Sequence, residues 1–179
     1  MQEVKIAQLC QRLLRAPTGP LIGLDVGTRY IGIAVSDSEY RIAHPHSVID
    51  IKGGPAGYAS NVLGTLVKTL SAPGLVIGYP LRITGFQGYQ GPLVEQFVRE
   101  LQQNQMLQDS CFVFWDERLT SRTVEGAISF LKLEPRRRKQ IVDKMAALCI
   151  LQSCLDNMAK NKDRHLLVLQ PVQTTQDCL

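Results

Sequence analysis

Hydrophobic residues form short runs along this chain, of the length that β-strands have. Five such runs predict strands, at residues 21–26, 30–36, 41–51, 75–78 and 111–115. Gly27-Thr28 separates the first two runs, which predicts an antiparallel β-hairpin. Pro45 falls inside the third run, where it would interrupt the strand.

Elsewhere the hydrophobic residues recur every three or four positions, which is the period of an α-helix. This spacing predicts helices over residues 3–15, 58–71, 93–101, 120–131 and 136–156. Residues 79–92, rich in glycine and proline, predict a loop, and residues 166–169 predict a short final strand. Because hairpin strands come first and β-α-β units follow, we expect an α/β fold: one mixed sheet, with antiparallel hairpin strands plus parallel strands, flanked by helices.

Length and composition narrow the class of protein. The chain has 179 residues, 45% of them hydrophobic and 20% charged, which predicts one folded domain and excludes enzymes that need two large lobes. The break at Pro17-Thr18-Gly19-Pro20 ends an N-terminal extension (residues 1–20). A domain (21–160) and a C-terminal tail (161–179) are expected to follow it.

The cysteines and the N-terminus bear on the compartment. Five cysteines without C-x-x-C spacing indicate free thiols in a reducing environment. No apolar run reaches the roughly 18 residues of a membrane span. The basic amphipathic N-terminal helix is expected to dock on the domain in a cytoplasmic protein. The alternative is the remnant of a transit peptide, which would place the protein in a chloroplast or mitochondrion.

Acidic residues occur where the pattern predicts burial. Asp25 lies inside the first apolar strand between two glycines, where it either caps the following turn or binds a cation. Asp116 and Glu117 end the last strand, and since successive strand residues face opposite ways, only one of them shares a face with Asp25. The alternative there is a salt bridge with a nearby arginine.

A further acid, Asp143, falls on the apolar face of the long helix, with Ala146, Ala147 and Ile150. It is either paired with Lys139 or part of a buried site. Three converging carboxylates repel one another and therefore favour a divalent ion. Oxygen ligands without His or Cys suit Mg²⁺ or Mn²⁺, and such ions activate water in phosphodiester hydrolysis.

The net charge of +4 is concentrated in one segment. Residues 118–144 contain eight basic and three acidic side chains, so this segment carries +5 and the rest of the chain −1. A basic run is often only a solvated helix start. Beside Asp143, however, it favours binding to the phosphate backbone of nucleic acid.

Four segments in order carry a family resemblance. LDVGTRYIGIAVS (24–36), GYPL (78–81), DERLTS (116–121) and DKMAA (143–147) resemble the motifs of the YqgF family, also called RuvX or Holliday-junction-resolvase-like. The resemblance spans about residues 21–156. It implies a ribonuclease H-like fold and a metal-dependent nuclease, with Asp25, Glu117 and Asp143 as the catalytic, metal-binding triad.

The resemblance also implies a substrate. The family is implicated in maturing the 5′ end of the small-subunit ribosomal RNA precursor, and older inference assigned it Holliday-junction resolution. Where the family usually has Asn-Met-Asp-Gly, this chain has Arg82-Ile83-Thr84-Gly85. Either Arg82 takes over as a phosphate contact at this loop, or the loop serves a different substrate. The residues expected to bind nucleic acid are Arg29, Arg82, Arg118, Arg122, Arg136, Arg137, Arg138, Lys139 and Lys144.

Three functions remain open from the sequence. The first is an endonuclease acting on structured RNA, such as a ribosomal precursor or particle. The second is a resolvase of four-way DNA, and the third is a nucleic-acid-binding module without catalysis. The expected state is a monomer or homodimer without membrane association. An actin-like ATPase, suggested by D-x-G-T alone, is disfavoured by the length of the chain, because such enzymes close two similar domains around a nucleotide.

Overall fold

A six-stranded mixed sheet lies at the centre of this computed structural model, which describes residues 1–15, 19–79, 90–116 and 134–168. Its strands are β1 (Gln2–Glu3), β2 (Ile22–Val26), β3 (Tyr30–Ser36), β4 (Ala43–Asp50), β5 (Gly74–Tyr79) and β6 (Cys111–Asp116). Their order across the sheet is β1-β6-β5-β2-β3-β4. Strand β3 is antiparallel to both of its neighbours, whereas the pairs β2–β5, β5–β6 and β6–β1 are parallel.

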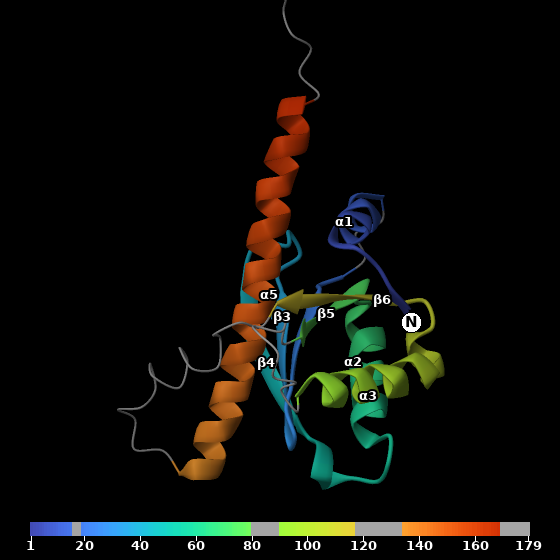
Figure 1. Ribbon diagram of the computed structural model, residues 1–179, viewed down its shortest axis with the longest axis vertical. Coiled ribbons are helices and arrows are strands. Elements are labelled where there is room, and N and C mark those ends of the chain that lie inside the picture. The colour runs from blue at the N-terminus through green and yellow to red at the C-terminus, as the bar shows by residue number, and fades with distance from the viewer. Residues whose placement is uncertain (16–18, 80–89, 117–133, 169–179) are drawn as a thin grey trace, which may run out of the picture.

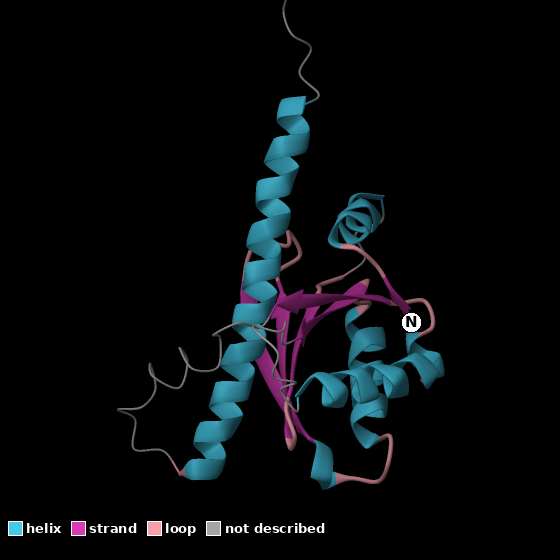
Figure 2. Cartoon of the chain, viewed as in Figure 1, coloured by secondary structure: helices cyan, strands magenta, loops and turns pink. Residues whose placement is uncertain are grey.

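Helices cover both faces of this sheet. They are α1 (Ile6–Arg15), α2 (Tyr58–Leu70), α3 (Gln90–Gln103) and α5 (Pro135–Val168), with short 3₁₀ turns at Ile51–Gly53 and Gln105–Leu107. Helix α5 lies along one face, and α2 and α3 lie against the other (Figure 1). The strands are therefore enclosed between two helical layers, as Figure 2 shows in magenta and cyan.

Side-chain alternation along the strands divides the core in two. On β2, Ile22, Leu24 and Val26 are buried with residues of α2 and α3. The intervening positions, Gly23 and Asp25, therefore face α5. The buried positions of the sheet toward α2 and α3 are thus apolar, whereas the face toward α5 carries a carboxylate.

The N-terminal segment joins the same sheet. Gln2 and Glu3 pair with β6, and α1 begins at Ile6 rather than at residue 3. Leu9 and Leu13 of α1 are buried in one cluster with residues of α5. Among the described residues, no helix has the length and apolarity needed to cross a membrane.

The predicted α/β fold with a mixed sheet is confirmed, and the five predicted strands correspond to β2–β6. The strand predicted at residues 166–169 is wrong, because α5 continues to Val168. Residues 156–168 contain neither glycine nor proline to end a helix. The helix predicted at 120–131 lies outside the described residues, as does most of the loop predicted at 79–92.

Candidate functional site

Asp25 points from β2 toward α5, in a place where the helix comes unusually close to the sheet. Gly23, two residues earlier on the same face, has no Cβ; one added there would lie 2.6 Å from Cβ of Leu151 and 3.0 Å from the carbonyl oxygen of Ala147. The helix can therefore approach β2 because this position is glycine. Asp25 is only 6% exposed, so its carboxylate lies in the gap between strand and helix.

Asp143 faces the same gap from the helix. It is 2% exposed, and Ala146 and Ala147 of the next turn are fully buried, so this side of α5 faces the sheet. Gly32 of β3 provides the contact, since a Cβ there would overlap the carbonyl oxygen of Asp143.

The two acids are brought together through this glycine. Gly32 is the strand partner of Asp25 in the antiparallel β2–β3 ladder, where opposite Cα atoms lie about 4.5–5.5 Å apart. Asp25 therefore lies beside Gly32 in the sheet, and Asp143 lies over it on the helix. Two of the three carboxylates predicted for the site thus converge.

Lys139 lies one helical turn before Asp143 and forms an ion pair with it, 2.6 Å from Nζ to Oδ1. The pairing considered from the sequence is therefore present. It does not make Asp143 a surface residue, because the lysine side chain is 53% exposed whereas that of the aspartate is 2% exposed. The lysine brings positive charge from the solvent side to a buried carboxylate.

The described part of β6 shows that one of the two acids at its end does not share a face with Asp25. Phe112 is buried in the cluster that includes α2 and α3, and Phe114 packs against it. Val113 is instead buried on the α5 side. Strand alternation therefore puts Asp116, the last residue of β6, on the face opposite Asp25. Glu117, the predicted third ligand, lies outside the described residues.

The donor set suits a hard divalent cation. Asp25 and Asp143 provide carboxylate oxygens only, and these are the ligands that Mg²⁺ and Mn²⁺ prefer. Two acids in one buried gap also repel each other unless a cation compensates them. Within the described ranges, no three His, Cys, Asp or Glu residues form a metal-binding group. A complete site would need a further ligand, such as Glu117.

Most of the described basic residues predicted to bind nucleic acid lie at the start of α5. Arg136, Arg137 and Lys139 are exposed on its first turns, and Arg138 is partly exposed. Lys144, next to Asp143, is also partly exposed. Arg82, Arg118 and Arg122 lie outside the described residues.

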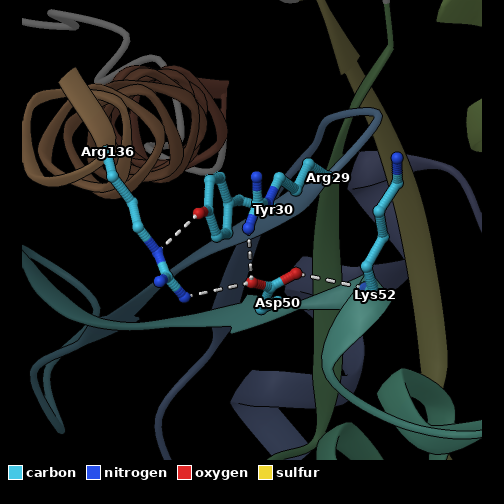
Figure 3. Close-up of polar contacts among 5 residues, drawn as sticks. All are labelled: Arg29, Tyr30, Asp50, Lys52 and Arg136. Carbon is cyan, nitrogen blue, oxygen red and sulfur yellow. Dashed lines mark hydrogen bonds and ion pairs between the residues drawn. The ribbon is translucent and has the colours of Figure 1, made fainter.

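Arg29 and Arg136 are brought together by Asp50, a residue that the sequence analysis did not single out. Oδ2 of Asp50 lies 3.5 Å from Nη2 of Arg29 and 3.6 Å from Nη2 of Arg136 (Figure 3). Its Oδ1 accepts a hydrogen bond from the backbone N–H of Lys52. The arrangement therefore connects the β2–β3 hairpin, the end of β4 and the first turn of α5.

Tyr30 completes this group. Its ring lies under the guanidinium of Arg29, with 5.1 Å from Cζ to the ring centroid, and its hydroxyl accepts a hydrogen bond of 3.2 Å from Nε of Arg136. This hydrogen bond raises the pKa of Arg136 above its ordinary value, with a smaller contribution from the charge of Asp50. The only feature of the sequence that indicates this group of side chains is Asp50 itself, an acid just before the Gly53-Gly54 break.

Comparison with known proteins gives consistent matches. The profile of a family described as "RuvX: Holliday junction resolvase" matches residues 19–157. A "Putative pre-16S rRNA nuclease" of Roseiflexus sp. (strain RS-1) is 39% identical over 139 residues, which are 78% of this chain and 95% of the relative. A protein of the same description from Methylocella silvestris is 37% identical over 158 residues, 88% of this chain and 93% of the relative.

Among solved structures, "T. thermophilus RuvC in complex with Holliday junction substrate" aligns with a TM-score of 0.48 and 10% identity. The alignment covers 78% of this chain and 96% of that chain.

Proposed function

Since this chain belongs to the RuvX family, we propose that it is a nuclease that processes the 5′ end of the small-subunit (16S-type) ribosomal RNA precursor. The relatives described as pre-16S rRNA nucleases support this substrate, because the match covers nearly their whole length. Their bacterial origin favours a cytoplasmic location.

The observation that carries the proposal is the convergence of Asp25 and Asp143 around Gly32. Neither acid contributes to an apolar core, and burying two carboxylates in one gap costs free energy. Such an arrangement is expected where the charges serve a reaction. The basic start of α5, with Arg136 to Lys139, lies beside it and suits a polyanionic substrate.

We assign Asp25, Asp143 and Glu117 as the residues that would hold Mg²⁺ or Mn²⁺. Bound there, the ion would supply a water of lowered pKa and neutralise charge developing at the leaving oxygen. The α5 face of β2 and β3 keeps the carboxylates buried and orients them, since Gly23 and Gly32 fix how closely the helix lies.

Around this centre the basic side chains bind and position the substrate strand. Lys139 lies at the solvent side of Asp143, where its ammonium would contact a phosphate next to the cleaved bond. Arg29 and Arg136 lie further along the same gap. Such backbone contacts hold the strand without reading its sequence, so specificity for the precursor end would come from its structure.

Cleavage of a pre-16S RNA fragment in Mn²⁺ tests the proposal. Wild type is expected to cut the fragment, and Asp25→Asn to leave it intact. Asp37→Asn is a matched control, because this aspartate caps a turn at the far end of β3. Equal cleavage by wild type and Asp25→Asn would refute the assignment.

The description of the matched family favours one second candidate, resolution of four-way DNA junctions. Paired, symmetric nicks in a junction, with no cleavage of the RNA fragment, would favour it over the RNA substrate. A module that only binds nucleic acid would bind both substrates in EDTA and cut neither in Mn²⁺.

A further inference from the structure

Two guanidinium groups share a single carboxylate oxygen in the group formed by Arg29, Tyr30, Asp50 and Arg136 (Figure 3). Both distances, 3.5 and 3.6 Å, exceed the roughly 2.7–2.9 Å of a strong charge-assisted hydrogen bond. Neither arginine is therefore fully engaged by Asp50. The carboxylate holds the two cations close together without neutralising both.

The unused donors face solvent. The side chain of Asp50 is 23% exposed, whereas those of Arg29 and Arg136 are 50% and 61% exposed. A guanidinium has five N–H donors, and the contacts with Asp50 and Tyr30 leave most of them available in each arginine. Two neighbouring guanidiniums with outward donors match the oxygens of a phosphate group.

The position of the pair relates it to the carboxylates. Arg29 follows Asp25 by four residues in the β2–β3 hairpin, and Arg136 precedes Asp143 by seven residues on the same side of α5. Seven residues of helix span about 10 Å, which is about three nucleotide steps along a stacked strand. The arginine pair and the acid pair therefore lie along one path between hairpin and helix.

We propose that Arg29 and Arg136 together bind one phosphodiester group of the substrate strand, about three nucleotides from the cleaved bond. Asp50 and Tyr30 are positioning residues: they hold the two guanidiniums at the spacing that one phosphate needs. The proposal rests on the nuclease function proposed above and adds a defined contact to it.

A purely structural role makes a different prediction. If the group only attached the first turn of α5 to β4, its loss would lower stability and leave RNA binding by the folded protein unchanged. Binding to a 20-nucleotide uridine RNA in EDTA separates the two roles, because no cleavage occurs there. Each phosphate contact contributes about 0.7 to the slope of log affinity against log salt for a single strand.

We expect Arg29→Ala, Arg136→Ala and the double variant each to lower the slope by about 0.7, since both side chains hold the same phosphate. Arg41→Ala is the matched control. This arginine is 75% exposed, pairs with Glu39, and lies at the opposite end of the β3–β4 pair. An unchanged slope in the double variant, or a loss of twice that amount, would overturn the shared phosphate site.

Asp50→Asn and Tyr30→Phe test the positioning role. Removing the negative charge of Asp50 would by electrostatics alone strengthen RNA binding, whereas loss of positioning weakens it. We expect about threefold weaker binding for each variant, compared at equal folded fraction. Tighter binding by Asp50→Asn would refute positioning.

Wild-type cleavage in Mn²⁺ is measured in parallel, so that the two proposals can fail separately. A wild type that cleaves RNA, with unchanged slopes in the arginine variants, would overturn the phosphate site alone. A wild type that neither binds nor cleaves RNA would overturn both.

Discussion

Over residues 150–158, α5 packs against the sheet and α1 through apolar side chains. Over residues 136–143 its contacts with the sheet include charged residues: Arg136 pairs with Asp50 of β4, and the buried Asp143 lies over Gly32 of β3. We call these the apolar half and the charged half of the helix contact. In the apolar half, Ile150, Leu151, Cys154, Leu155 and Met158 are buried. Burial there raises the pKa of the Cys154 thiol to about 12, so this thiol stays protonated at neutral pH.

The two halves of the helix contact have different roles. Burial of apolar area in the apolar half stabilises the fold, and it holds the helix in place where the charged half offers little net stabilisation. The charged half can then keep Asp25 and Asp143 in one buried gap. Stability and activity should therefore respond to different substitutions along the same element.

The largest expected effect is on activity, in the charged half. Asp143→Asn should lower cleavage of the pre-16S fragment by more than the 10–100-fold that loss of a supporting residue typically costs, since a proposed metal ligand is removed. The free energy of unfolding should change by less than about 1 kcal/mol, because a buried charge is removed together with its ion pair. Cleavage by Asp143→Asn within tenfold of wild type would contradict the separate roles of the two halves.

The next largest effect is expected for Gly32→Ala, at the glycine that lies between the two acids. The added Cβ would overlap the backbone of Asp143, so α5 must move away from β3. We expect a loss of about 3 kcal/mol in urea unfolding and reduced cleavage by the folded protein. Gly53→Ala is the control, because a Cβ there comes no nearer than 3.6 Å to Asp50. Equal behaviour of the two variants would mean that the close approach is unimportant.

In the apolar half, Leu155→Ala should lower the free energy of unfolding by about 2.5 kcal/mol through loss of buried methyl groups. Cleavage per folded molecule should stay at the wild-type value. Leu14→Ala, at a side chain that is 67% exposed, should change neither quantity. If Leu155→Ala reduced cleavage by the folded protein, the two halves would not be independent.

The smallest effect is expected outside both halves, at Asp37. Hydrogen bonds from the backbone N–H groups of Arg41 and Ile42, 2.7 and 3.2 Å long, hold the pKa of Asp37 below its ordinary value of 3.8. The carboxylate therefore stabilises the fold above its unfolded-state pKa, and this contribution is lost as the pH falls through the folded-state pKa.

Asp37→Asn should accordingly lower the unfolding free energy at pH 7 by less than about 1 kcal/mol, because the group is exposed to solvent screening. Urea midpoints of variant and wild type should converge at acid pH. A difference between the urea midpoints that grows on acidification would contradict the lowered pKa of Asp37.

Much of the site could be predicted because its signals are local. The predicted α/β fold with a mixed sheet and the resemblance to the RuvX family are confirmed. Asp25 within an apolar strand, and Asp143 at helical spacing from Ala146 and Ala147, are visible in single elements, and the structure buries both acids on the predicted faces.

Features that depend on several elements could not be predicted. The role of Asp50 follows from its ion pairs with Arg29 and Arg136, which are distant from it in sequence. The pairing of Gln2 and Glu3 with β6 involves two residues, too few for a periodic pattern. The full length of α5 could not be predicted, because the run Leu166-Leu167-Val168 is equally compatible with strand and helix.

The central claim is that Asp25 and Asp143, with Glu117, hold the divalent ion of a nuclease. A crystal structure of the protein soaked in Mn²⁺, with the ion located by its anomalous scattering, tests this most directly. The account predicts a Mn²⁺ peak in the gap between Asp25 and Asp143, absent from crystals of Asp25→Asn. No peak there, in crystals of protein that cleaves RNA in Mn²⁺, would contradict it.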